Sequence, residues 1–156
     1  ERWVAITDPR MLGIAANATE PFELVASKGN TARAILQNLP PGEYDGITAR
    51  FRFKAGVDAN GGIDLDDRVV YVSNLHNWFM VAHLVADKWV LDLEKACGER
   101  DGYVITILIE NGEYIMFLDG EEMGRYKTPS TRIIRPQIST GQGPTSFDQV
   151  RLRKKS

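Results

Sequence analysis

Two acidic residues and a tyrosine near the middle of the chain are of the types that proteins use to hold a sugar. Asp64 and Asp66 stand two positions apart, and Tyr71 follows them. Residues i and i+2 of a strand point to the same face, so both carboxylates are expected to face outward if Ile63 and Leu65 point inward. Carboxylates accept hydrogen bonds from sugar hydroxyls, and an aromatic ring stacks on the apolar face of a sugar. The grouping therefore predicts a carbohydrate-binding site.

Trp78 and His83 extend this candidate site along a further alternating segment. Met80 would share a face with Trp78, whereas Phe79 would share the other face with His83. The alternation alone does not decide which face is buried, and both Trp78 and His83 are retained as candidate sugar-binding residues. Trp89 has apolar neighbours, so packing in the core or at a sheet edge is its favoured interpretation.

Asp58 and Asn60 open a segment that is rich in oxygen ligands and glycine. Ca²⁺ prefers several oxygen ligands on a bendable loop, and the spacing of these two residues matches the start of an EF-hand loop. An EF-hand is excluded, because Ile63 occupies the position that requires glycine and no glutamate closes the loop. No cofactor is required by the sequence, and a structural calcium site with ligands from separate loops, Asp58 and Asn60 among them, is the weaker prediction.

A basic face is predicted by four arginines in two alternating segments. Arg50 and Arg52 lie on the polar side of one segment, and Arg151 and Arg153 alternate in the same way near the end of the chain. Both pairs face solvent if the apolar residues between them are buried. Such a face could bind an acidic polysaccharide or a partner protein. The alternative is an ordinary solvated surface in which acidic side chains are interleaved with the arginines.

The composition limits the other classes of function. The 156 residues include 19 Lys and Arg and 21 Asp and Glu, which gives a net charge of −2. This balance argues against a general nucleic-acid binder, because affinity for a phosphate backbone requires a basic excess. No apolar run approaches the length of a membrane-spanning helix, so membrane insertion is not expected. Cys97 is the single cysteine, which excludes an intrachain disulfide and the Cys-rich zinc sites.

The elements that must position these side chains are predicted to be strands. Residues 47–54 alternate between apolar and polar types, which places Ile47, Ala49 and Phe51 on a buried face. Asn111-Gly112 separates two β-branched and aromatic runs, and this dipeptide favours a type I′ hairpin turn. Other strands are predicted at residues 22–26, 32–37, 62–65, 69–72, 78–85, 89–93, 133–139 and 146–153. Many short strands separated by such turns predict an all-β sandwich or barrel.

The order of these segments is similar to that of a known superfamily. Residues 47–54 and then Gly61-Gly62-Ile63-Asp64-Leu65 look like an early strand pair, residues 103–120 look like a strand–turn–strand that ends in Asp-Gly, and residues 147–152 look like a closing strand. In this order they resemble the concanavalin A-like lectin and glucanase superfamily, which includes laminin-G-like domains. Within it the chain is most similar to levanase-type carbohydrate-binding modules and 3-keto-disaccharide hydrolase-like domains. The resemblance implies a jelly-roll β-sandwich of two antiparallel sheets, one of them concave and often used to bind glycans.

The length suits one domain over residues 1–156. Because the chain begins at Glu1 with neither an initiator methionine nor a signal peptide, we expect a domain excised from a larger or processed chain. We expect its location to be extracellular, periplasmic or at the cell surface.

The favoured function is a noncatalytic carbohydrate-binding domain whose partner is an oligo- or polysaccharide and which has flanking domains. One alternative is a glycoside hydrolase or related sugar hydrolase that uses Asp64 and Asp66 as a carboxylate pair. This alternative is weaker because the Glu-x-Asp-x-x-Glu run of jelly-roll glucanases is absent. A second alternative is a laminin-G-like protein-interaction domain that uses the basic face, since the resembled fold makes the two arginine-bearing strands neighbours.

Overall fold

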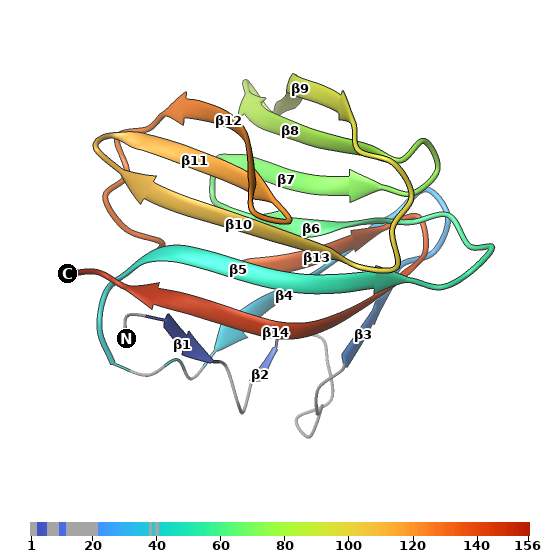
Figure 1. Ribbon diagram of the computed structural model, residues 1–156, viewed down its shortest axis with the longest axis horizontal. Coiled ribbons are helices and arrows are strands. Elements are labelled where there is room, and N and C mark those ends of the chain that lie inside the picture. Colours follow the sequence, from blue (N-terminus) through green and yellow to red (C-terminus); the bar gives the residue numbers. More distant parts are fainter. Residues whose placement is uncertain (1–2, 6–9, 12–21, 38, 40) are drawn as a thin grey trace.

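The computed structural model describes residues 3–5, 10–11, 22–37, 39 and 41–156, which form two antiparallel β-sheets packed face to face (Figure 1). No helix occurs among these described residues. The part of the chain that is described thus contains no helix that could cross a membrane. The predicted β-sandwich is confirmed.

Seven strands of each sheet lie within the described residues. The order in the first sheet is β1, β14, β5, β10, β11 and β12, with β3 also paired to β14. These strands are β1 (Trp3–Ala5), β3 (Phe22–Val25), β5 (Tyr44–Phe53), β10 (Tyr103–Glu110), β11 (Glu113–Leu118), β12 (Glu121–Lys127) and β14 (Pro144–Lys154). The order in the second sheet is β2, β4, β13, β6, β7, β8 and β9. These strands are β2 (Arg10–Met11), β4 (Thr31–Gln37), β6 (Asn60–Asp64), β7 (Arg68–Ser73), β8 (Trp78–Val85), β9 (Lys88–Ala96) and β13 (Gln137–Gly141).

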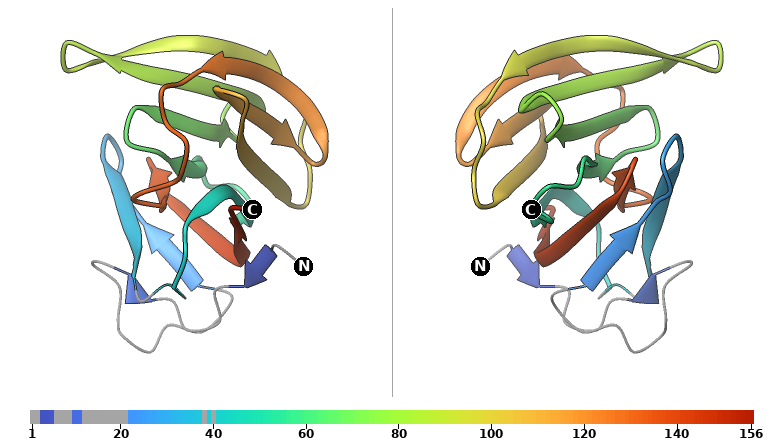
Figure 2. Two further views of the ribbon diagram at one scale, coloured as in Figure 1. Left: turned by 90° about the vertical axis from the view of Figure 1, so that its left-hand side faces the viewer. Right: turned by 90° about the vertical axis from the view of Figure 1, so that its right-hand side faces the viewer.

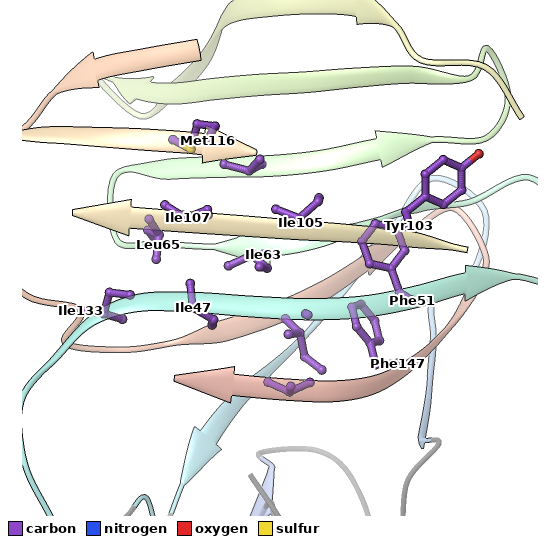
Figure 3. Close-up of a cluster of buried hydrophobic side chains, with 14 of the residues drawn as sticks. Ile47, Phe51, Ile63, Leu65, Tyr103, Ile105, Ile107, Met116, Ile133 and Phe147 are labelled. Atoms are coloured by element: carbon purple, nitrogen blue, oxygen red, sulfur yellow. The ribbon is translucent and has the colours of Figure 1, made fainter. Parts of the chain in front are cut away.

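The core lies between the sheets and is built from the apolar half of each alternating strand. In β5, Ile47, Ala49 and Phe51 are fully buried, as the period of two predicts. The ring of Phe51 packs against Tyr103 of β10 and Phe147 of β14, with centroids 5.8 and 5.6 Å apart (Figure 3). Burial of a large apolar side chain contributes about 1.5–3 kcal/mol, so this layer dominates the stability of the sandwich.

The hairpin signals in the sequence correspond to real turns. Asn111 and Gly112 have φ values of 51° and 76° and connect β10 to β11. Asp119 and Gly120, with φ values of 49° and 83°, connect β11 to β12. A type I′ turn requires positive φ at both central residues, and these residue types accept it.

The predicted strand at residues 133–139 begins later than expected, because β13 starts at Gln137. Pro136 precedes that start and has no N–H to donate to a ladder. Ile133 is buried, but its backbone N–H donates to the carbonyl of Tyr44, 2.7 Å away, from within a connecting segment. The apolar residues of this segment therefore fill the end of the core without extending a strand.

The hairpin formed by β8 and β9 projects beyond its neighbours (Figure 2). β9 is the last strand of the second sheet, and the turn at Ala86 and Asp87 has positive φ at both residues. This projecting hairpin lies at one side of the face on which the candidate site is found.

Candidate functional site

The outer face of the second sheet, opposite the core, carries a depression of about 230 Å³. Its floor is formed mainly by β4, β13, β6 and β7, and the β8–β9 hairpin supplies one side. The lining residues are Thr31, Arg33, Asn60, Asp64, Val69, Tyr71, Ala82, Trp89, Ser139 and Gly141.

Strand alternation and register explain why these side chains meet. Val70 is fully buried, so its neighbour Tyr71 points to the outer face. The ladder places Arg33 of β4 opposite Ser139 of β13, and Ser139 opposite Gly62 of β6. Gly62 in turn lies opposite Tyr71 of β7. A single row across four strands therefore carries the main polar and aromatic groups.

Asp64 forms the polar floor of the depression. Its carboxylate is paired with the Nε of Arg33 and accepts a hydrogen bond from Ser139 Oγ at 2.8 Å. The Asp64 side chain is only 6% exposed, whereas that of Arg33 is 43% exposed. Asp64 therefore orients and neutralises the guanidinium, and Arg33 presents the accessible donors. Asp64 does lie on the outer face, as expected with Ile63 buried, but its pairing with Arg33 and Ser139 leaves it almost inaccessible.

Tyr71 and Trp89 provide the aromatic surface of the depression. Burial raises the pKa of Tyr71 above its ordinary value of 10.0, and the nearby charge of Glu94 raises this pKa further. The phenol is therefore neutral at physiological pH and can donate a hydrogen bond. Trp89 is 46% exposed on the projecting hairpin. Of the two placements expected for Trp89, the core is wrong and the sheet edge is right, because Trp89 lies on the edge strand β9 and lines the depression.

Asp66 does not join Asp64 in the depression. β6 ends at Asp64, and the backbone of Leu65 and Arg68 then closes a tight turn through two mutual hydrogen bonds. Asp66 is exposed in this turn and borders a different, small cavity beside Tyr114. The expected common strand face of the two aspartates is therefore wrong, since the period of two ends with the strand.

Trp78 and His83 lie on opposite faces of β8. Phe79 and Val81 are fully buried, so Trp78 is on the outer face with Tyr71. The ring of Trp78 lies 4.8 Å from that of His76, beyond the residues that line the depression. His83 shares the inward parity of Phe79 and is turned away from the depression.

His83 belongs to a polar cluster that attaches the β8–β9 hairpin to the rest of the molecule. Its Nδ1 lies 2.8 Å from Oδ1 of Asp92, and Oδ2 of the same carboxylate accepts a 2.5 Å hydrogen bond from Arg68. The Arg68 guanidinium lies 5.2 Å from the ring centroid of Tyr126 on β12 of the first sheet. Asp92 reaches this cluster because a bulge in β9 shifts the register there.

The two residues proposed for calcium lie in different places. Asn60 lines the depression, whereas Asp58 borders a second cavity of about 270 Å³ near Arg100 and Tyr103. Across the described residues, no group of three or more His, Cys, Asp or Glu side chains could hold a metal ion. Calcium binding stays a prediction without a supporting cluster in these ranges.

The basic face is only partly as expected. β5 and β14 are paired, so the two arginine-bearing strands are indeed neighbours. Arg153 is buried, however, and it donates to Asp45 Oδ1 at 2.7 Å. Arg50 forms a two-point contact with Asp148 at 2.7 and 2.6 Å.

The remaining two arginines of this face, Arg52 and Arg151, are exposed. The expectation that Arg153 faces solvent is wrong because its side chain lies over Gly46, where a Cβ would be 3.0 Å from that of Arg153. Glu110 also contacts this guanidinium, at 3.2 Å. Acidic partners therefore neutralise two of the four arginines, which fits the solvated-surface alternative better than a polyanion site.

The lining residues that the sequence does not single out as sugar-binding candidates include Arg33, Ser139 and Trp89. Alternation in residues 32–37 does place Arg33 on the polar side of its strand. Its pairing with Asp64 spans 31 positions, and that of Ser139 with Asp64 spans 75 positions. Such contacts depend on strand order, which alternation does not specify.

The geometry suits binding better than hydrolysis. Glycoside hydrolases use two carboxylates on either side of the scissile bond. Asp64 is the one carboxylate among the residues that line the depression, and it is already committed to Arg33 and Ser139. A general acid and a nucleophile are thus not both present among those lining residues.

No family model matches the sequence, and no curated protein matches it. Solved structures do share the fold. The carbohydrate binding module CBM66 from Bacillus subtilis is 11% identical with a TM-score of 0.65, over 96% of this chain and 93% of that one. A Crh5 transglycosylase in complex with NAG is 9% identical with a TM-score of 0.62, over 99% and 80%. Sheep galectin-11 is 8% identical with a TM-score of 0.53, over 86% and 98%. The chain therefore has the jelly-roll fold of the concanavalin A-like lectins and glucanases.

Proposed function

We propose that this chain is a noncatalytic carbohydrate-binding domain that holds a glycan in the depression on the second sheet. The observation that carries the proposal is the placement of two accessible rings, Tyr71 and Trp89, beside the polar floor of Arg33, Asp64 and Ser139. A sugar has an apolar face and a set of hydroxyls, and it needs a stacking surface and hydrogen-bonding groups next to each other.

The charges of the site favour a neutral glycan. Arg33 is the one cation among the lining residues, and its charge is compensated by Asp64. Glu94, close enough to raise the pKa of Tyr71, adds negative charge nearby. A polyanion would be attracted by an excess of positive charge, which these residues do not provide.

The comparisons support a glycan ligand at a general level. One similar structure is named as a carbohydrate binding module, and another was solved in complex with NAG. At such low sequence identity the two structures show that the fold is shared, but they do not indicate which sugar this chain binds. Because the proposed ligand is a polysaccharide, we also propose that the protein is located outside the cytoplasm.

The test is binding to a glycan array, followed by calorimetry of the oligosaccharides that bind. Tyr71→Ala and Trp89→Ala are expected to weaken binding by about tenfold each, because each removes a stacking surface. Tyr71→Phe keeps the ring and should retain most of the affinity. Arg151→Ala, on the other sheet, is the matched control and should bind like the unchanged protein. The proposal fails if no neutral glycan binds.

A further inference from the structure

The outer face of β7, β8 and β9 carries a line of aromatic and apolar side chains that continues beyond the depression. Because Phe79 and Val81 are buried, Trp78, Met80 and Leu84 of β8 point outward. We define the aromatic stripe as these side chains together with Tyr71, Ala82, Trp89 and Leu91. The depression accounts for Tyr71, Ala82 and Trp89 but not for the other members.

The register fixes the positions of the three rings along the stripe. Tyr71 lies opposite Met80, and Trp89 lies opposite Leu84. With about 3.4 Å per residue, Trp78 is about 7 Å from the level of Tyr71 and about 20 Å from the level of Trp89 along the strand. The rings therefore follow one direction, parallel to β8, and extend over more length than one sugar ring occupies.

The stripe is accessible at both ends, whereas Ala82 between them is only 6% exposed. Leu84 and Leu91 are 42% and 45% exposed beside Trp89, and Trp78 is partly exposed at the other end. The contact of Trp78 with the His76 ring limits the orientations that Trp78 can adopt. Exposed apolar side chains gathered on one face in this way mark ligand or partner sites on soluble proteins. Figure 2 shows that the hairpin carrying Leu84 and Trp89 projects from the molecule, so a long ligand could lie along it.

Polar groups accompany the stripe and indicate what lies on it. Ser73 is opposite Trp78, and Asn60 is opposite Ser73 on the next strand. At the level of Tyr71, the row continues to Ser139 and Arg33. Ser73 and Ser139 are buried, so the accessible polar groups of this row are the Asn60 amide and the paired Arg33 guanidinium. Rings on one side and these hydrogen-bonding groups on the other match a chain of sugars, whose residues each present an apolar face and hydroxyls. A protein partner or lipid would not require that second row.

We propose that the ligand is an extended neutral oligosaccharide that runs along β8 from Trp89 past Tyr71 to Trp78, with Trp78 as a separate subsite. This inference rests on the proposed function. It adds that the site binds several consecutive sugars within an oligosaccharide and not only a single terminal sugar. Trp78 should then matter only for ligands that are long enough to reach it.

The experiment is calorimetry with neutral xylan, β-glucan and fructan oligosaccharides from disaccharide to hexasaccharide. Affinity is expected to rise by about fivefold to tenfold between the shortest and longest members of the series that binds. Trp78→Ala should abolish this gain while leaving the disaccharide affinity within about twofold. Trp78→Phe should restore the gain, and Leu75→Ala, an exposed neighbour, is the control.

The two proposals fail in different ways. Equal affinity for short and long members, or a length-dependent gain that Trp78→Ala leaves intact, overturns the extended path while the depression remains a glycan site. Absence of binding to every member and to the array overturns the glycan function and this inference with it.

Discussion

Arg33 of β4 reaches across β13 to pair with Asp64 of β6 in the floor of the depression. Ser139 of β13 donates to the same carboxylate at 2.8 Å, so three adjacent strands converge on one buried acid. The pair therefore contributes both to the cohesion of the sheet and to the polarity of the proposed glycan site.

Arg33→Ala is expected to lower the free energy of unfolding by about 1–2 kcal/mol, because the buried Asp64 charge keeps only the hydroxyl of Ser139 as a donor. Because Arg33 is partly exposed to solvent, we expect this loss of stability to be smaller than for a fully buried ion pair. Urea unfolding at neutral pH measures the change. Arg52→Ala, exposed on the first sheet, should change stability by no more than about 0.5 kcal/mol. Equal stability of both variants would show that the pair does not support the sheet.

Most of the fold was predictable from the sequence because its signals are local. The period of two in residues 47–54 places Ile47 and Phe51 in the core, and Asn111-Gly112 specifies a turn through backbone sterics alone. The candidate site was predictable only in part. Asp64 and Tyr71 do meet in the depression, but their neighbour Arg33 comes from a strand whose place in the sheet no local pattern encodes.

The errors in the predicted site have physical causes of the same kind. Alternation puts Asp66 on the same face as Asp64 only while the strand continues, but the turn after Leu65 ends it. Parity predicts that Arg153 faces solvent, but Gly46 leaves space into which the arginine folds toward Asp45. Alternation predicts the side of a sheet on which a residue lies, but not whether a neighbour covers it.

Gly62 is expected to be essential to the shape of the depression floor. A Cβ at this position would lie 2.0 Å from the carbonyl oxygen of Val70 and 2.7 Å from the Cβ of Tyr71. Gly62→Ala should therefore force the strands apart and lower the free energy of unfolding by about 1–3 kcal/mol. Thermal or urea unfolding measures this loss. Gly102→Ala is the matched control, because its nearest contact would be an ordinary 3.6 Å. Similar stability of the two variants would contradict the close approach at Gly62.

The contact between Arg50 and Asp148 predicts a defined response to acid. Hydrogen bonds from Arg50 hold the pKa of Asp148 below its ordinary value of 3.8, with a smaller contribution from the charge of Arg52. The folded state therefore binds this proton less readily than the unfolded state. The contact stabilises the fold fully above pH 3.8, and this stabilisation is lost as the pH falls through the lower folded value.

Asp148→Asn tests this prediction through unfolding measured from neutral to strongly acid pH. The variant should be less stable than the unchanged protein at neutral pH, and the difference should shrink below pH 3.8 as Asp148 becomes protonated in the unchanged protein. Glu23→Gln, an exposed acid of the same sheet, serves as the control. A difference that stays constant with pH would assign the loss to packing and not to the charge.

The projecting β8–β9 hairpin should depend on Arg68 for its attachment. Arg68 is 12% exposed, donates to Asp92 of β9 and lies against the ring of Tyr126 in the first sheet. Arg68→Ala would leave Asp92, itself only 16% exposed, with His83 as its remaining side-chain partner in the cluster. We expect the free energy of unfolding to fall by about 1–3 kcal/mol and the amides of β9 to exchange hydrogen faster.

Hydrogen exchange followed by mass spectrometry separates a loosened hairpin from a general loss of stability. In Arg68→Ala, protection should fall more in β8 and β9 than in β5 and β10, which lie in the first sheet. Lys88→Ala, an exposed change on the same hairpin, should leave the pattern unaltered. Arg68→Lys should recover only part of the protection, because an ammonium cannot both donate to Asp92 and lie flat on the ring of Tyr126. A uniform loss across all strands would mean that the cluster supports the whole sandwich and does not specifically hold the hairpin that carries Trp89.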